Sequence, residues 1–449
     1  MEIKRRDFLK LVGLSGATAA ISGCSPGPVE KLVPYLIPEE EIIPGEATWY
    51  ASVCGECPAG CGVLVKTVEG RAIKVEGNPQ HPVNQGRLCA RGQASLQGLY
   101  NPDRIQQPLK KTADGSFQPI TWDVAEKTLA TQLSQLRGQG DRLAFVTPLL
   151  TGSLDRLVDE WLKSLGGGTR LRYELISHES LREANRIAFG LPGIPYYDFE
   201  AARFVLSFGA DFLATWLSPV EFAGQFASAR TYRDGGMSRF VYVGPRLSLT
   251  GANSDEWISV RPNTEAFLAL SMMQVVLAEN LTNGLAATEK QELRALVAGF
   301  APESRAKDVG IGADKIRALA RAFARERPSL AVADGNGRNG TEACLAVNLL
   351  NYVVGNVGQT VQFGLDSGAS RVSSYSEIRK LIDTLEQGKI AVLLLAGVNP
   401  VFTLPESERF QAALKKIPLV VSFASFPDET AAASNLVLPE NTFLESWGD

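Results

Sequence analysis

Four cysteines of this chain are spaced like the ligands of a metal site. Cys54, Cys57, Cys61 and Cys89 follow the pattern C-x2-C-x3-C-x27-C. Thiolates are soft ligands, and four of them suit an iron–sulfur cluster or a structural zinc ion. A zinc ribbon usually pairs two C-x2-C knuckles, whereas the second half of this set is a single cysteine. The spacing therefore favours a [4Fe-4S] cluster, with zinc as the alternative; two disulfides would be strained at such close spacing.

The first residues of the chain indicate its cellular compartment. Residues 4–10 read KRRDFLK and hold the pair Arg5-Arg6, and an apolar run follows over residues 11–23. That run is too short to span a bilayer, which needs ~20 residues, but it fits the apolar part of an export signal. The arginine pair indicates the twin-arginine route, which carries folded proteins and so allows a cluster to be inserted before export.

The first cysteine of the chain, Cys24, follows Ile21-Ser22-Gly23 and resembles the lipid-modified residue of a lipoprotein cleavage box. We expect residues 1–23 to be a twin-arginine signal and the mature chain to be lipid-anchored at Cys24, on the periplasmic face of the membrane. The alternative is a plain signal peptide with an incidental cysteine.

Composition excludes several function classes. The chain has 449 residues, 45% of them hydrophobic, which is enough for about three domains. Its formal charge is −4 and, outside the expected export signal, it has no cluster of basic residues, so nucleic-acid binding is not expected. His81 and His178 are the only histidines and leave little material for histidine-based catalysis. Cys344 lies in an apolar helical stretch, where we expect a buried core thiol.

The chain divides into regions of different pattern. Residues 24–47 are rich in proline and predict an extended tether. Residues 48–110 contain the cysteines among short alternating runs and predict a small β-rich iron–sulfur domain. From residue 111 to 449, amphipathic helical stretches alternate with short apolar strands, which predicts two interleaved α/β domains with parallel sheets. The helices are expected at 122–137, 153–165, 264–280, 313–326, 341–354 and 376–386, and the strands at LAFVT, FVLSF, FVYV, SLAVA, AVLLLA and LVVSF.

An internal repeat strengthens the α/β prediction. FVLSFGADFLATW at 204–216 matches AVLLLAGVNPVFT at 391–403 in pattern: a strand, then a glycine, then a polar turn. Ligands bind outside the carboxyl ends of strands in open α/β sheets. Gly209 and Gly397 would allow a phosphate or ring to approach the backbone closely at two such ends. The repeat therefore predicts two related doubly wound domains that hold an extended two-part ligand, or that descend from a protein that held one.

Several segments together resemble the molybdopterin oxidoreductase family. They are the cysteine set, GNPQHPVNQGRLCARG, YNPDRI, PITWDVA, GVNPV, DETAAASNLVLPE and FLESWGD. The resemblance implies a [4Fe-4S] cluster, a molybdenum or tungsten bis(pyranopterin guanine dinucleotide), two related α/β domains and a carboxy-terminal six-stranded β-barrel. The sequence ends at Asp449, where the approach to the barrel would begin. We therefore expect the barrel to be missing, in an amino-terminal portion of a longer protein or in a short relative.

The tether, EKLVPYLIPEEEIIPGEATWYAS, is similar to one branch of this family. That branch is the large periplasmic subunit of alternative complex III and of the menaquinone reductase complex. The similarity implies partners: iron–sulfur, cytochrome and membrane subunits of a quinone-linked complex, with an indirect link to the quinone pool.

The resemblance also assigns site residues. The positions carried over for pterin binding are Gly209, Asp211, Gly244, Arg246, Thr264, Glu265, Gly397, Asn399, Thr430 and Asn435. Arg91 takes the place of a basic electron relay between cluster and pterin. The position of the molybdenum ligand falls on Ser177, and no cysteine lies in this segment. A serine at a helix start is usually an N-cap, so we expect capping rather than ligation.

Four positions depart from the family pattern. Gly244 stands where a carboxylate is expected, and Asn435 replaces an aspartate. In the PGTD turn, at residues 262–265, Asn263 replaces the glycine and the longer Glu265 replaces the aspartate. We therefore expect an iron–sulfur electron-transfer subunit without catalytically active molybdenum. The alternatives are an active molybdopterin oxidoreductase and a structural four-cysteine zinc module.

Overall fold

The computed structural model describes residues 43–232, 236–365, 368–446 and 448. The chain divides into two compact units, residues 1–46 and 47–449, and every element below belongs to the second. Arg5, Arg6 and Cys24 lie outside the described residues, as does most of the expected tether. Within the described ranges, no helix is long and apolar enough to cross a membrane.

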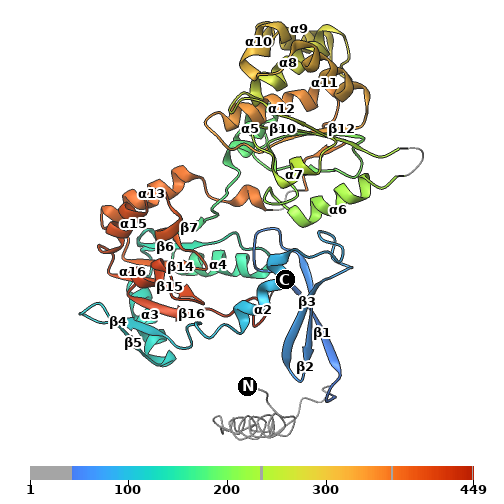
Figure 1. Ribbon diagram of the computed structural model, residues 1–449. Coiled ribbons are helices and arrows are strands. Elements are labelled where there is room, and N and C mark those ends of the chain that lie inside the picture. The colour runs from blue at the N-terminus through green and yellow to red at the C-terminus, as the bar shows by residue number, and fades with distance from the viewer. Residues whose placement is uncertain (1–42, 233–235, 366–367, 447, 449) are drawn as a thin grey trace, which may run out of the picture. The chain divides into compact units, whose positions relative to one another are not determined.

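Three antiparallel strands and a helix form the cysteine-bearing domain (Figure 1). The strands, in sheet order, are β1 (Ala47–Val53), β2 (Gly62–Val68) and β3 (Arg71–Gly77). Helix α2 (Ala90–Leu99) packs on β3. Val63 and Val75 are fully buried and share a small core with Cys54 and Cys61. The alternating apolar residues of β2 place one face of this sheet on that core.

The first α/β domain has a seven-stranded sheet in the order β5-β4-β16-β15-β14-β6-β7. The parallel strands are β6 (Leu143–Thr147), β7 (Thr169–Arg172), β14 (Val392–Ala396), β15 (Leu419–Ala424) and β16 (Leu436–Pro439). Two antiparallel strands, β4 (Leu109–Lys111) and β5 (Phe117–Pro119), complete one edge.

Helices cover both faces of this sheet, as Figure 1 shows around β6 and β14. Ala144 and Val146 of β6 share a core with α13 (Tyr375–Glu386) and α15 (Ser407–Leu414). Leu143 and Phe145 share another core with α3 (Trp122–Gln135) and α4 (Gly152–Ser164). A strand covered on both faces must be apolar throughout, which explains the continuous hydrophobic run LAFVT.

The second α/β domain is inserted between β7 and α13, and its parallel sheet has the order β11-β10-β9-β12. Its strands are β9 (Phe204–Phe208), β10 (Arg239–Val243), β11 (Glu256–Ile258) and β12 (Ser329–Ala333). A two-stranded ladder joins β8 (Tyr196–Tyr197) to β13 (Val361–Gln362). The helices of this domain are α5 (Glu179–Phe189), α6 (Pro219–Ala229), α7 (Leu249–Ala252), α8 (Glu265–Ala278), α9 (Ala287–Leu296), α10 (Pro302–Val309), α11 (Ala313–Arg325) and α12 (Gly340–Val354).

The predicted α/β architecture is confirmed. All six predicted strands are present, and the six predicted helices end within two residues of the expected positions. The expected domain boundary at residue 110 falls inside β4, which pairs with β16 in the seven-stranded sheet. A three-residue strand is too short to show a periodic pattern, so the sequence did not reveal that Leu109 and Lys110 belong to the α/β domain. Cys344 is fully buried in α12, as expected.

Candidate functional site

A β-hairpin brings two of the four cysteines together. Cys54 directly follows β1 and Cys61 directly precedes β2, and the Cys54 amide donates a 2.8 Å hydrogen bond to the Cys61 carbonyl. Cys57 lies in the loop between them, and Cys89 is the N-cap residue of α2. Cys54 and Cys61 are 7% and 5% exposed, whereas Cys89 is exposed. The hairpin and the start of α2 thus carry the four thiols, two of them inside the small core.

Electrostatics identify the kind of group these thiols suit. Burial, with a smaller contribution from the neighbouring thiols, raises the pKa of Cys54 to about 11 and that of Cys61 to about 12. Metal ligation requires thiolates, so this site favours a strongly positive partner that offsets burial and mutual repulsion. A [4Fe-4S] cluster is held by four such thiolates.

His81 adds a buried polar atom beside the cysteines. Within the described residues, no group of three or more His, Cys, Asp or Glu side chains is placed to hold a metal ion. The His81 ring packs on Gly62, where an added Cβ would lie 2.3 Å from it, and the buried Nδ1 atom of His81 has no partner among the described residues. An unpartnered buried nitrogen beside Cys61 suits a cluster that offers sulfur acceptors.

Arg91, the expected electron relay, lies in the first turn of α2. Its guanidinium donates a 3.2 Å hydrogen bond to the carbonyl of Glu56, inside the cysteine loop. Burial raises the pKa of Glu56, and the charge of Arg91 opposes that rise. Arg91 therefore joins α2 to the loop between Cys54 and Cys57.

The two glycines of the internal repeat occupy matching positions. Gly209 follows β9 with φ +77°, and Gly397 follows β14 with φ +62°. The amide of Gly209 donates to the Val243 carbonyl at 2.9 Å, and that of Gly397 donates to the Phe423 carbonyl at 3.2 Å. Each glycine thus turns the chain at the carboxyl end of a parallel strand, where ligands of such sheets bind.

A polar cavity of about 200 Å³ opens at the carboxyl ends of β9, β10 and β12. Gly209, Arg246 and Glu265 line it, and Gly244 and Thr264 are sequence neighbours of lining residues. Asn263 also lines it and has φ +61°, a conformation that asparagine tolerates better than most residues. Loss of the family's glycine therefore leaves this turn intact.

Asp334 is a lining residue that the sequence reasoning missed. It follows β12, and its side chain accepts a hydrogen bond from Asn336 at 2.5 Å. Burial raises the pKa of Asp334, and the charge of nearby Asp211 raises it further. The sequence contained a signal for this residue, because an Asp-Gly pair follows the predicted strand SLAVA, as a glycine follows each strand of the internal repeat. Asp334 and Glu265 give this cavity the carboxyl groups that Gly244 cannot provide.

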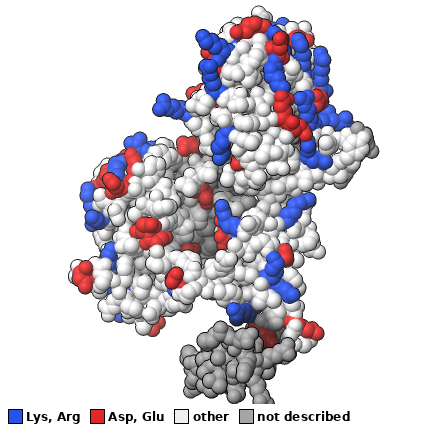
Figure 2. All heavy atoms as spheres, viewed as in Figure 1, with Lys and Arg blue, Asp and Glu red and all other residues white. Residues whose placement is uncertain are grey.

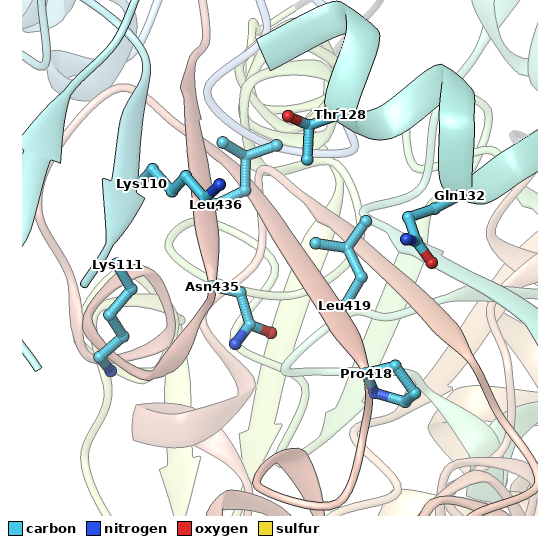
Figure 3. Close-up of a pocket in the computed structure, with 8 residues that line it drawn as sticks. All are labelled: Lys110, Lys111, Thr128, Gln132, Pro418, Leu419, Asn435 and Leu436. Atoms are coloured by element: carbon cyan, nitrogen blue, oxygen red, sulfur yellow. The ribbon is translucent and has the colours of Figure 1, made fainter. Parts of the chain in front are cut away.

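The structure separates Asn435 from the other pterin candidates. Asn435 precedes β16, whereas Gly397 follows β14, so the two lie at opposite ends of the parallel strands. Asn435 and Lys110 line a different cavity of about 290 Å³ there, shown in Figure 3. The Oδ1 atom of Asn435 accepts a 2.7 Å hydrogen bond from the amide of Val420, so its observed contact is structural.

The expected N-cap role of Ser177 is wrong. Helix α5 begins at Glu179 and its N-cap residue is His178, which has φ +50° and makes no side-chain capping bond. Burial lowers the pKa of His178 to about 4, and the charge of Arg182 adds to the effect. Ser177 therefore lies one residue outside the cap, half-buried, and no cysteine lies near it in the sequence.

Charges do not gather into one broad patch on the face drawn in Figure 2. Lysine and arginine side chains alternate with acidic ones over both α/β regions of that face.

Comparisons with known proteins match the chain to two family models and to curated relatives. Residues 47–101 match the molybdopterin oxidoreductase Fe4S4 domain, and residues 104–448 match the molybdopterin oxidoreductase family model. The menaquinone reductase, molybdopterin-binding-like subunit of Nitratidesulfovibrio vulgaris is 30% identical, over 100% of this chain and 67% of that protein. The arsenate respiratory reductase molybdopterin-containing subunit of Shewanella sp. strain ANA-3 is 24% identical, over 100% of this chain and 62% of that protein.

One solved structure shows the same fold. Acetylene hydratase from Pelobacter acetylenicus superposes with a TM-score of 0.70 at 18% identity, over 88% of this chain and 63% of that one. The chain thus spans roughly two thirds of the length of the proteins it matches.

Proposed function

Because this chain belongs to the molybdopterin oxidoreductase family and carries its Fe4S4 domain, we propose that it is the iron–sulfur electron-transfer subunit of a quinone-linked respiratory complex. The observation that carries the proposal is the four-cysteine site, with two buried thiols and an exposed Cys89. A cluster with one exposed ligand can exchange electrons with a partner subunit and still be protected from water on its other side.

The quinone link rests on a relative. The subunit of Nitratidesulfovibrio vulgaris that matches the whole chain is named as part of a menaquinone reductase, and as molybdopterin-binding-like. We propose that this chain likewise works beside iron–sulfur, cytochrome and membrane subunits, and passes electrons to or from the quinone pool through them. The twin arginine and Cys24 support a location of the proposed complex at the periplasmic face of the membrane.

A second candidate function, that of an active molybdopterin enzyme, is favoured by the cavity beside Gly209. Asp334, Glu265 and Arg246 line that cavity and offer carboxylates and a guanidinium to the guanine end of the cofactor. When bound, the cofactor supplies a redox-active metal to the substrate. Gly244 argues against tight binding, because one lost hydrogen bond to a charged group costs about 1.5–3 kcal/mol.

Metal analysis of the full-length protein, purified anaerobically in its membrane complex, separates these functions. About four irons per chain without molybdenum or tungsten is the expected result. Stoichiometric molybdenum or tungsten, with turnover abolished by Ser177→Ala, would replace the electron-transfer proposal with the molybdoenzyme. One zinc per chain and no iron would leave only a structural role for the cysteines.

A further inference from the structure

Glu221 brings a carboxyl group from the inserted α/β domain to the cysteine site. It lies in the first turn of α6, which begins at Pro219. The preceding residue, Val220, packs into the same small apolar core as Cys54 and Cys61. The start of α6 is therefore part of the wall around the cysteine site.

One face of α6 is directed toward the cysteine domain. Gly224 lies three residues after Glu221 and so shares its side of the helix. A Cβ added at Gly224 would lie 2.8 Å from the Arg87 guanidinium, and Arg87 lies two residues before Cys89. The contacts of Val220 and Gly224 thus place the first turns of the helix, with Glu221 between them, against the cysteine domain.

No cation compensates this carboxyl group in the described part of the chain. No lysine or arginine there forms an ion pair with Glu221, and the nearby Arg87 donates to Gln85 instead, at 3.4 Å. The Glu221 side chain is half-buried, and Gly224, on the same side of the helix, is buried. A half-buried carboxyl group in the wall of a site is a candidate for a functional role.

We propose that Glu221 tunes the cluster: its negative charge, held in the wall of the cysteine site by the start of α6, lowers the reduction potential of the [4Fe-4S] centre. The potentials of such clusters depend on nearby charge, hydrogen bonds and solvent exposure. Reduction adds one electron and therefore one negative charge, which a neighbouring carboxylate opposes. The inference rests on the proposed function, because it concerns the cluster on which electron transfer depends.

The test is a redox titration of Glu221→Gln in the full-length protein, purified anaerobically and followed by electron paramagnetic resonance. Glutamine keeps the size of the side chain and removes its charge, so we expect a midpoint potential more positive than that of the wild type. Glu221→Asp keeps the charge and should remain close to the wild type. Glu183→Gln is the matched control, since Glu183 pairs with Arg186 on the separate helix α5.

Iron content is measured on every variant. A wild-type midpoint in Glu221→Gln with full iron content would overturn the proposal, as would an equal shift in Glu221→Asp. If Glu221→Gln loses iron, Glu221→Ala is titrated in its place with the same expected direction. A wild-type protein without any cluster signal would instead overturn the proposed function itself, and the inference with it.

Discussion

Asp211 and Asn399 make the same hydrogen bonds in two different domains. The Oδ1 atom of Asp211 accepts from the amide and the hydroxyl of Thr250, at 3.1 and 2.5 Å. The Oδ1 atom of Asn399 accepts from the amide and the hydroxyl of Thr430, at 3.2 and 2.7 Å. Both pairs fix the turn that follows a repeat glycine, so the sequence repeat is also a repeat in atomic detail.

A second matching pair explains Asn435. Its Oδ1 atom accepts from the amide of Val420 in β15, and the carboxylate of Asp255 accepts from the amide of Phe240 in β10, both at 2.7 Å. Each residue binds the start of a strand, at the amino ends of the parallel strands, whereas the repeat glycines lie at the carboxyl ends. We therefore assign Asn435 a structural role, which is to hold the start of β15.

The two threonines provide a stability test of the repeat. Both are fully buried, so replacing either with valine removes a hydroxyl and keeps the volume. We expect Thr250→Val to lower the free energy of unfolding by about 1.5–3 kcal/mol, because its acceptor is a carboxylate, and Thr430→Val by about 0.5–1.5 kcal/mol, because its acceptor is an amide. Denaturant unfolding of both variants measures the difference, and equal losses would contradict this ranking.

Removing one cysteine should remove the cluster. Cys57→Ala leaves three thiolates, so we expect most of the iron to be lost together with part of the stability of this domain, since metal binding is linked to folding. Iron analysis and visible absorbance report the loss. Cys344→Ala is the control: Cys344 is buried in α12, far along the chain, and that variant should keep its iron.

Glu440 should make stability depend on pH. Burial raises its pKa from 4.5 to about 7, although the backbone of Gly397 opposes the rise. Between these pH values the folded state keeps a proton that the unfolded state releases, so this carboxyl lowers the free energy of unfolding as pH rises from 4.5 to 7. A difference of one pKa unit corresponds to about 1.4 kcal/mol when fully expressed.

Glu440→Gln mimics the protonated form and should therefore gain stability relative to the wild type at pH 8, with little gain at pH 4. Glu429→Gln is the control, because hydrogen bonding from Asn399 lowers the pKa of Glu429. The ionised form of Glu429 therefore stabilises the folded state, and its replacement should not gain stability at pH 8. Denaturant unfolding at the two pH values decides the matter, and a pH-independent gain in Glu440→Gln would count against burial as the cause.

Export provides a test of the amino-terminal prediction. Replacing Arg5 and Arg6 together with lysine should stall export, because the twin-arginine route reads that pair. Cys24→Ser should release the mature chain from the membrane without loss of its iron. Cell fractionation and mass spectrometry of the mature amino terminus measure both effects. A mature chain that begins at another residue, without lipid, would refute the anchor.

The sequence alone determined the elements and the metal chemistry. The spacing of the thiolates indicates a cluster because few other groups use four such ligands. The hydrophobic periodicity of strands and helices is a local property of the sequence. FVLSF and AVLLLA were therefore located correctly. The family resemblance, confirmed by comparison, rested on the same local motifs.

Only the tertiary structure decided how distant residues meet. It brought Asp334 into the cavity beside Gly209 and placed Glu221 against the cysteine domain. It also placed Asn435 at the amino ends of the parallel strands, away from the repeat glycines. It also assigned the N-cap of α5 to His178 in place of Ser177. These facts depend on strand order, burial and helix packing across long stretches of chain, and no local pattern of residue types encodes them.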